Sequence, residues 1–300
     1  MFSYPLFFCC KILQANCAEN WIGMGPLWQQ IAERMVSFMT NIFVEGIQGA
    51  GKSTLVNQLQ EEMTGIKVCR EGDYSPVELA WCARMTEAEY EEILKKYPTL
   101  REDIIAHTVR EKEHRIVMYT RIRTEQQEFY EELESFEIYN GRKSLAEIKE
   151  IVFSRYESFR ENGYLFECAF FQNLVEDMIL FHLMSDEEIM DFYRILFQKV
   201  DKEQFILLYL YSENIEENIQ IVRKERCDEE GREAWFQMMM EYFANSPYGQ
   251  KYGYSTEADL IAHFQHRQQL ELNIVREVLG EKAVILPSKG YDIEEIIKLI

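Results

Sequence analysis

The sequence predicts an α/β fold in which a five-stranded, mainly parallel sheet carries helices on both faces. Short apolar segments alternate with longer segments in which apolar residues recur at helical spacing, as expected for buried parallel strands and their crossover helices. The pattern Gly-x-x-x-x-Gly-Lys-Ser follows directly after the first apolar segment, at residues 46–53. With 300 residues, 47% of them hydrophobic, the chain can form one large domain or two small ones.

Five segments supply the predicted strands: 41–45, 66–70, 164–170, 205–211 and 283–286. Each is apolar over most of its length, which is typical of strands that are covered on both faces. After the first strand, Leu55, Leu59 and Met63 recur at helical spacing, so a helix is expected there. No internal repeat, low-complexity tract or proline-rich linker divides the chain.

Residues 72–163 are predicted to form a helical insertion between the second and third strands. At four places in this stretch a Thr or Ser is followed three residues later by Glu or Gln, which is the sequence pattern of a helix capping box. The pairs are Thr86 with Glu89, Thr99 with Glu102, Thr124 with Gln127 and Ser144 with Glu147. After the fourth strand, a charged helix is predicted to run to about residue 237.

The loop at residues 46–53 predicts a phosphate-binding site and, with it, the three-layer fold of P-loop NTPases. Glycines in such a loop let the backbone turn tightly and aim its N–H groups inward, and the following helix adds the positive end of its dipole. Lys52 is placed to reach the outer phosphates, and the Ser53 hydroxyl to ligate Mg²⁺. The expected nucleotide-binding residues are Gly46, Gly49, Ala50, Gly51, Lys52, Ser53 and Thr54. The alternative is a glycine-rich turn with a surface lysine.

The amino-acid composition limits the classes of molecule that this protein is expected to bind. A formal charge of −20 argues against nucleic acid and anionic membranes, because both bind basic surfaces. Seven cysteines without a C-x-x-C pair indicate reduced thiols, and no apolar run reaches about 18 residues, so a cytoplasmic location is expected. Residues 1–36 are expected to form an N-terminal extension with no catalytic part. Phe, Tyr and Met residues in the predicted helices leave a homodimer open.

Three segments carry a resemblance to known kinases. The first is the loop, in the form Gly-x-x-Gly-x-Gly-Lys-Ser, and the second runs from Arg70 to Val77. The third, residues 205–226, reads as a strand followed by a helix that ends Val-Arg-Lys-Glu-Arg. Together they resemble the P-loop deoxynucleoside kinases and thymidylate kinases over roughly residues 40–300. The resemblance implies a kinase-like domain at residues 37–300, with its acceptor side in 72–163 and a lid in 213–237.

This resemblance implies ATP- and Mg²⁺-dependent phosphoryl transfer to a nucleoside, a nucleotide or a similar small acceptor. Lys52 would neutralise phosphate charge. Glu71 lies where the deoxynucleoside kinases carry a base, so it is the candidate proton acceptor; the alternative is a partner of Arg70 or a surface acid. Arg226 as a catalytic residue and Arg223 as a nucleotide-binding residue are the lid candidates, whereas interleaved charges are also typical of any solvated helix.

Four residues are candidates for substrate contact: Arg70, Asp73, Trp81 and Glu167. Trp81 matches, at a longer spacing, the Trp that follows Glu-Pro-Val in the deoxynucleoside kinases. Asp73 is a candidate for Mg²⁺-water ligation or base work, or alternatively a turn-former before Pro76. Glu167 lies on an apolar strand, where burying an acid is expensive, so metal or substrate contact is weighed against a structural ion pair.

Three features depart from the family pattern or fall outside it. Both kinase families place an arginine after the acid that ends the third strand, whereas here Glu167 is followed by Cys168. A pocket for a base or a charged acceptor is a further hypothesis for Trp81, Arg84, Arg115, Tyr119, Arg121 and Arg123. His263 and His266 lie three apart without a third ligand, so a surface pair is expected and no metal site is assigned to them.

Two other functions stay open beside the kinase. The first alternative is a nucleotide-binding module or slow NTPase whose insertion contacts a protein partner and which has no small-molecule acceptor. The second alternative is a structural relative that binds no nucleotide. A GTPase is disfavoured because the chain has no N/T-K-x-D motif for reading guanine.

Overall fold

The computed structural model describes residues 40–300 with the exception of residue 229, and these residues form one compact unit, Thr40–Ile300. The expected N-terminal extension at residues 1–36 lies outside the described residues. Within the described part of the chain, no helix is long and apolar enough to cross a membrane.

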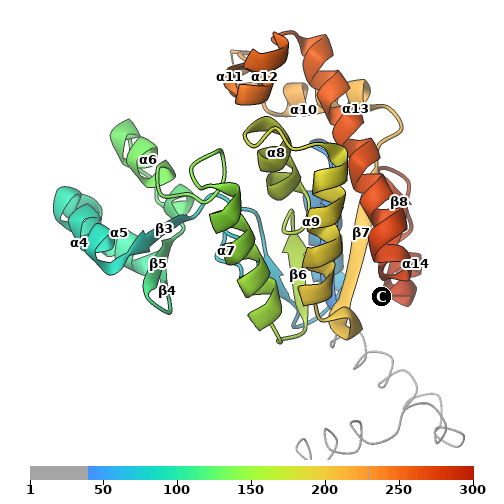
Figure 1. Cartoon of the computed structure of the whole chain (residues 1–300), viewed down its shortest axis with the longest axis horizontal. Coiled ribbons are helices and arrows are strands. Elements are labelled where there is room, and N and C mark those ends of the chain that lie inside the picture. The colour runs from blue at the N-terminus through green and yellow to red at the C-terminus, as the bar shows by residue number, and fades with distance from the viewer. Residues whose placement is uncertain (1–39, 229) are drawn as a thin grey trace, which may run out of the picture. The chain divides into compact units, whose positions relative to one another are not determined.

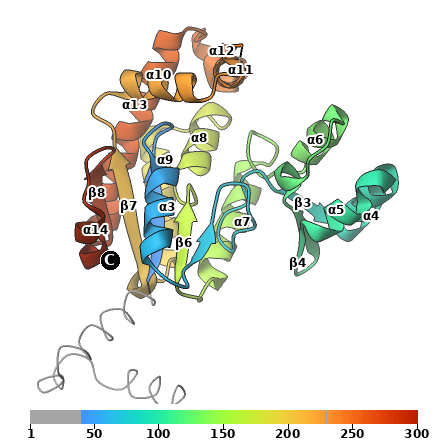
Figure 2. The same ribbon diagram turned by 180° about the vertical axis from the view of Figure 1, so that it is seen from behind.

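A five-stranded parallel sheet forms the centre of this unit, as the sequence predicts (Figures 1 and 2). Its strands are β1 (Asn41–Gly46), β2 (Lys67–Cys69), β6 (Tyr164–Glu167), β7 (Phe205–Tyr211) and β8 (Ala283–Pro287). They lie side by side in the order β2-β6-β1-β7-β8. Val44 is paired with Glu167 and Gly46 with Leu210. The carboxyl ends of β1 and β6 are therefore neighbours, and this edge of the sheet is where ligands of parallel α/β proteins bind.

Helices cover both faces of the sheet and make three layers. α3 (Lys52–Glu62) lies in front of the sheet in Figure 2 and packs against β1, β6 and α14 (Ile293–Leu299). On the other face, in front of the sheet in Figure 1, lie α7 (Leu145–Ser158) and α9 (Asp186–Lys199), which pack against each other. α8 (Gln172–Leu180) follows β6, and α13 (Glu257–Ile274) packs against α9 and α10 (Ile215–Glu225).

Aromatic side chains fill the core under β1. Phe43 is 2% exposed, and its ring centroid lies 4.7 Å from those of Phe166 on β6 and Phe205 on β7. Burying an aromatic side chain of this size stabilises the fold by about 1.5–3 kcal/mol. Because each of these strands is covered on both faces, its sequence is apolar at consecutive positions, which is the pattern that predicted the sheet.

The insertion is a mixed α/β unit, which corrects the prediction of a helical insertion. Three short strands, β3 (Ala83–Thr86), β4 (Thr108–Glu111) and β5 (His114–Val117), form an antiparallel sheet in the order β3-β5-β4. Helices α4 (Glu87–Lys96), α5 (Arg101–Ala106) and α6 (Gln127–Glu134) accompany it. The unit has its own apolar core, which includes Met85, Leu94 and Phe129. Each strand has only four residues and contains at least one charged or imidazole side chain, so it gives no apolar run in the sequence.

Two of the four predicted capping boxes in the insertion are confirmed. Thr86 caps α4 with Glu89, and Ser144 caps α7 with Glu147. The other two are wrong: Thr99 lies inside the 3₁₀ turn Pro98–Leu100, and α6 begins after Gln126, without a side-chain cap. A match to the four-residue pattern is therefore insufficient where a neighbouring turn already occupies the position.

The region after β7 contains two helices where the sequence predicts one. α10 (Ile215–Glu225) ends early, and α11 (Ala234–Asn245) begins after a turn; α12 (Pro247–Tyr252) follows. In that turn the Asp228 carboxylate accepts hydrogen bonds from the backbone N–H groups of Glu230 and Arg232. Gly231, in the same turn, has a φ of 76°, a left-handed conformation that glycine adopts without strain. Local side-chain to backbone bonds of this kind compete with helix formation.

A chain of hydrogen bonds connects the core of the insertion with α11. The Tyr119 hydroxyl donates to Glu137 at 2.5 Å, and the Asn140 side-chain amide donates to the same carboxylate at 3.2 Å. The Tyr242 hydroxyl on α11 donates to the Asn140 side-chain oxygen at 2.8 Å. Tyr119 and Glu137 are 3% and 2% exposed, so the hydrogen bond between these two residues is shielded from water.

Candidate functional site

The loop between β1 and α3, residues 46–53, depends on its glycines for its conformation. Gly46, Gly49 and Gly51 have φ angles of 143°, 78° and 87°, which side-chain-bearing residues rarely adopt. A Cβ on Gly46 would lie 2.7 Å from the carbonyl oxygen of Leu210 on β7. At Gly49 it would lie 3.0 Å from Val222 Cγ2 on α10. The loop is therefore held tightly between β7 and α10.

Lys52 folds back over this loop. Its ammonium group donates to the carbonyl oxygens of Gly46 at 2.9 Å and Ile47 at 2.8 Å, and the residue is 7% exposed. Lys52 is thus the first residue of α3, and its side chain also holds the start of the loop in place. Of the other predicted loop residues, Ala50 is buried and donates its N–H to the Ile47 carbonyl, whereas Thr54 is exposed in the first turn of α3.

Ser53 and Glu167 meet at the edge of the sheet. The Ser53 hydroxyl donates to the Glu167 carboxylate, which ends β6 next to β1. The guanidinium of Arg70 lies 3.8 Å from the same carboxylate and also donates to Asn57 at 2.6 Å and Gln60 at 2.9 Å on α3. The structure brings Ser53, Glu167 and Arg70 together from three separate segments, although the sequence assigned them separate tasks.

Glu71 follows Arg70 directly after β2. Hydrogen bonds to one of its carboxylate oxygens hold its side chain in place. Glu71 Oε1 accepts hydrogen bonds from the Trp81 indole N–H at 2.9 Å and from the Gln172 side-chain amide at 2.8 Å. In the described part of the chain no hydrogen bond reaches Oε2, so this oxygen remains available as an acceptor. Trp81 is 43% exposed and has a φ of 60°. Both sequence candidates, Glu71 and Trp81, therefore belong to one cluster.

Asp73 has a structural role in this segment. Its carboxylate accepts the backbone N–H of Arg70 at 3.0 Å and pairs with Arg121 at 2.7 Å. Arg121, from the insertion, also donates to the Glu71 carbonyl at 3.2 Å. The turn-forming alternative for Asp73 matches these contacts, and they occupy the carboxylate on both of its oxygens.

Glu45 is a buried acid that holds the backbone next to the candidate site by hydrogen bonds. It is fully buried on β1, and its carboxylate accepts the backbone N–H groups of Phe170 at 2.5 Å and Gln172 at 3.3 Å. Burial raises the pKa of Glu45 to about 8, and the hydrogen bond from Phe170 offsets only part of this effect. Glu45 thus fixes the turn from which Gln172 reaches Glu71.

Sequence reasoning missed Glu45 and Gln172. For Glu45 a signal existed, because an acid inside an apolar strand is the same feature that singled out Glu167. For Gln172 no signal existed, since an amide at the start of a helix is common and its partner lies 101 residues away.

The arginines of the predicted lid contact side chains of α11, of α13 and of the turn before α11. Arg223 pairs with Glu257 at 2.9 Å and Glu233 at 2.6 Å, and its guanidinium lies 3.9 Å from the Phe236 ring centroid. Arg226 is exposed and lies 4.5 Å from the Trp235 ring centroid. Among the described residues no acid lies within ion-pair distance of Arg226, whereas Arg232 pairs with Asp228 and Glu230.

The insertion residues proposed as one pocket are dispersed, which corrects that hypothesis. Trp81 and Arg121 lie at Glu71, as described. Arg115 pairs with Glu87 at 2.9 Å, the Tyr119 hydroxyl binds Glu137, and Arg84 contacts His114 at 3.3 Å. Residues on opposite faces of a small sheet cannot line one cavity, and the sequence pattern did not reveal these faces because the strands were not recognised.

Cys168 is buried at the end of β6, with a φ of 59°. Burial raises the pKa of its thiol well above the ordinary value, so it is no thiolate at neutral pH. Its backbone N–H donates to the Val44 carbonyl at 3.2 Å, so the residue continues the β1–β6 pairing. The thiol cannot replace the charge of an arginine at this position.

The two histidines have separate partners. His266 contacts Asp186 at 2.8 Å, while His263 is 3% exposed and contacts Glu176 at 3.0 Å, so the expectation of a surface pair is wrong for His263. Glu176 also binds the fully buried Arg267 at 2.9 Å. Arg267 pairs in addition with Glu271 at 3.1 Å, and Glu271 accepts the Tyr209 hydroxyl at 2.7 Å. These contacts form a buried ionic cluster between α8, α13 and β7.

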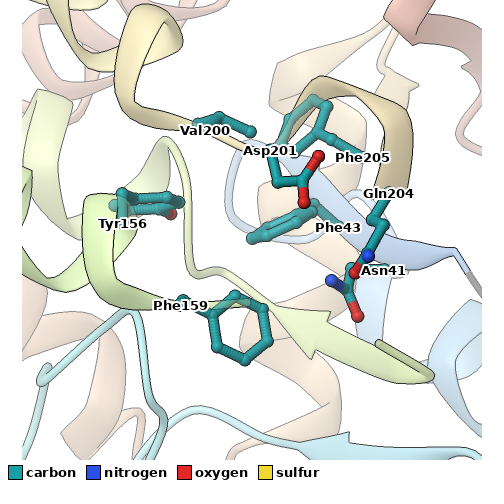
Figure 3. Close-up of a pocket in the computed structure, with 8 residues that line it drawn as sticks. All are labelled: Asn41, Phe43, Tyr156, Phe159, Val200, Asp201, Gln204 and Phe205. Atoms are coloured by element: carbon teal, nitrogen blue, oxygen red, sulfur yellow. The ribbon is translucent and has the colours of Figure 1, made fainter. Parts of the chain in front are cut away.

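A small cavity lies at the opposite edge of the sheet, at the amino ends of β1 and β7 (Figure 3). Its volume is about 10 Å³, which is about the space of one water molecule. Its walls carry Asn41, Phe43, Tyr156, Phe159, Val200, Asp201, Gln204 and Phe205. None of these residues belongs to the candidate site.

No protein-family model matches this sequence, and no curated protein matches it. In residues 40–300 apart from 229, no group of three or more His, Cys, Asp and Glu side chains is arranged to hold a metal ion. Any cation at the candidate site would therefore take most of its ligands from a bound molecule or from water.

Proposed function

We propose that this protein is a P-loop kinase that transfers the γ-phosphoryl group of ATP, with Mg²⁺, to a nucleoside, a nucleotide or a similar small acceptor. The observation that carries the proposal is the meeting of Ser53 with Glu167 beside a glycine loop whose conformation excludes side chains. Glu71, a second carboxylate, of which one oxygen accepts no hydrogen bond from the described residues, lies in the neighbouring segment after β2.

The donor side of the proposed site is the loop 46–53. The φ angles of Gly46, Gly49 and Gly51 expose backbone N–H groups at the start of α3, an arrangement suited to phosphate. Lys52 adds a positive charge whose present partners are two neutral carbonyl groups. A phosphate is a stronger acceptor for an ammonium group than a carbonyl, so exchange of partners is favourable.

Ser53 and Glu167 fit a Mg²⁺ site of the P-loop type, which uses one hydroxyl, one carboxylate nearby, water and phosphate oxygens. When bound, Mg²⁺ would neutralise charge on the phosphates. The chain's own contribution is to hold the hydroxyl and the carboxylate together. Arg70 supports this by anchoring the Glu167 side of the pair to α3.

On the acceptor side, Glu71 is the proposed group that takes the proton from the acceptor hydroxyl. Trp81 and Gln172 hold its Oε1, which orients Oε2 without occupying it. Arg121 and Asp73 stiffen the backbone around it. Arg226 is the proposed lid residue for the phosphates, because no acid pairs with it within the described residues and it lies on an exposed turn after α10.

Two variants test the proposal against a panel of nucleosides and nucleotides with γ-labelled ATP. Glu71→Gln should lower kcat by about 10²- to 10⁴-fold, the usual contribution of a general base, and leave ATP binding unchanged. Lys52→Ala should abolish transfer and weaken ATP binding. Glu61→Gln, which removes an exposed acid of the same type on α3, is the matched control. Full transfer by Glu71→Gln would exclude its assigned role, and full transfer by Lys52→Ala would exclude the kinase proposal.

One observation favours the second candidate, a nucleotide-binding module or slow NTPase without a small-molecule acceptor. The buried Cys168 thiol stands where an arginine would orient the acceptor. The same assay separates the two. If ATP with Mg²⁺ raises the melting temperature while no member of the panel gives labelled product, the second candidate is supported and the kinase is not.

A further inference from the structure

A cleft of about 850 Å³ lies between the small antiparallel sheet of the insertion and α7, away from the glycine loop. Its walls come from β4, β5, the segment around Tyr74 and Pro76, and the length of α7, elements that can be followed in Figure 1. No residue of the loop 46–53 lines it. The volume falls within the range of small-molecule sites, about 300–1,000 Å³.

The pairing of the small sheet shows which of its side chains face this cleft. His114 is paired with Glu111 and with Thr86, and Ile116 with Arg84. Side chains alternate along a strand, so Arg84, Glu111 and His114 share one face. These three residues line the cleft, whereas Arg110 and its pairing partner Arg115 lie on the other face and do not.

The acids in the cleft wall are largely engaged with partners of their own. Glu111 pairs with Arg155 and accepts the Tyr74 hydroxyl, and Glu161 pairs with Lys67 at 3.0 Å. The Glu147 carboxylate accepts the backbone N–H and the hydroxyl of Ser144 as the helix cap. The two other acids of the wall, Glu113 and Glu150, take no part in these contacts.

The cations in the wall are less engaged. Within the described residues, no carboxylate lies within ion-pair distance of Arg84, Lys112 or Lys143, all of which line the cleft. The wall carries five basic and five acidic side chains, so its charges balance, in a chain that carries 52 acids against 32 basic residues. Arg84, Lys112 and Lys143, which are not committed to an acid of the wall, are the groups that favour an anionic ligand here.

Arg84 and His114 give this surface its chemical selectivity. An Arg84 guanidinium nitrogen lies 3.3 Å from His114 Nδ1. Arginine has only donors, so His114 accepts with Nδ1, and the proton of its neutral ring is on Nε2, a second donor. Burial, and then the charge of Arg84, lower the pKa of His114, which favours this neutral form. The planar Arg84 fork and an imidazole N–H match the oxygens of a carboxylate or phosphate.

We propose that this cleft is a second ligand site, which binds a small organic anion carrying a phosphate or carboxylate group, with Arg84 as its main anchor. Tyr74, Pro76, Ile151 and Phe159 supply an apolar wall for the carbon part of the ligand. The proposal does not rest on the kinase function, because the cleft lies within residues 72–163 but shares no residue with the loop 46–53 or with Glu71, Trp81 and Gln172.

Hydrogen-exchange mass spectrometry on the full chain tests it, with inorganic phosphate and citrate as separate probes and chloride at equal ionic strength as reference. Either probe should protect peptides covering residues 108–117 and 143–158. Arg84→Gln should weaken that protection by about ten-fold or more in probe concentration, since it removes the bidentate donor. Arg110→Gln, on the opposite face, should leave it unchanged.

The location of the protection separates this site from the glycine loop. Protection by neither probe overturns the proposal, and so does phosphate protection of residues 46–53 alone together with no protection by citrate. An equal loss in Arg84→Gln and Arg110→Gln overturns it as well. If Arg84→Gln does not fold by circular dichroism, Lys143→Gln is used, with an expected loss of about three-fold; no loss then overturns the proposal. Protection by phosphate but not citrate identifies the ligand group as phosphate.

Discussion

Replacing Glu45 by Gln should change how the stability of this protein depends on pH. Glu45 is fully buried on β1, and its pKa is raised from 4.5 to about 8 mainly by burial. A carboxyl group of this kind binds its proton more tightly in the folded protein than in the unfolded chain. Its contribution is therefore most favourable below about pH 4.5 and is lost as the pH rises toward about 8.

The size of the effect follows from the two pKa values. Each pKa unit corresponds to about 1.4 kcal/mol, and the shift from 4.5 to about 8 is about 3.5 units. Integrated between about pH 5 and about pH 8, this one group should lower the free energy of unfolding by roughly 3–4 kcal/mol. Glu78 and Glu137, both with a pKa raised to about 7 by burial, act in the same direction. The wild-type profile alone therefore does not isolate Glu45.

Urea unfolding of the wild type and Glu45→Gln, measured at several pH values from 5 to 8.5, isolates the contribution as a difference. The variant should lose stability with rising pH less steeply by the amount above. Glu61→Gln, an exposed site on α3, should follow the wild-type profile. Parallel profiles for the wild type and Glu45→Gln would refute the reasoning, because they would show that Glu45 titrates alike in the folded and unfolded chain.

Three further predictions concern the loop, the ionic cluster and the proposed Mg²⁺ site. Gly46→Ala places a Cβ 2.7 Å from the Leu210 carbonyl oxygen at a φ of 143°, so urea unfolding should show a loss of about 2 kcal/mol or more; an unchanged midpoint contradicts this. Arg267→Met leaves two buried carboxylates without their cation and should cost about 3–5 kcal/mol by the same measurement, whereas a gain in stability would show that the cluster is not held by its charge. Glu167→Gln should raise the Mg²⁺ concentration for half-maximal transfer by about 10- to 100-fold; an unchanged Mg²⁺ titration removes Glu167 from the site.

The central sheet was predictable because its strands are buried on both faces and so are apolar at consecutive positions. All five predicted strands are present, four of them at nearly the predicted bounds, whereas the third ends at Glu167 and not at residue 170. The sheet of the insertion was not predictable in this way. Its strands are half-covered, short and interrupted by residues such as Arg84 and His114, and their pairing depends on contacts between distant segments. Capping patterns identified α4 and α7 but not α5 and α6.

For the candidate site, the sequence located single residues but not their partners. An acid inside an apolar strand identified Glu167, and its contact with Ser53 follows from the adjacency of β1 and β6, which the sequence order does not reveal. The same holds for Gln172 at Glu71. Arg223 was predicted to contact phosphate, and the ion pairs that hold it to Glu233 and Glu257 could not be read from residues so far apart.

The bonds that run from Tyr119 through Glu137 and Asn140 to Tyr242 have a mechanical consequence. An outward swing of the small α/β unit would either rupture one of these three links or pull α11 along, and α11 continues the segment that bears Arg226. Movement of the small α/β unit is thereby tied to movement of α11. A molecule that pushes the small α/β unit away from α11 would therefore alter the positions of both.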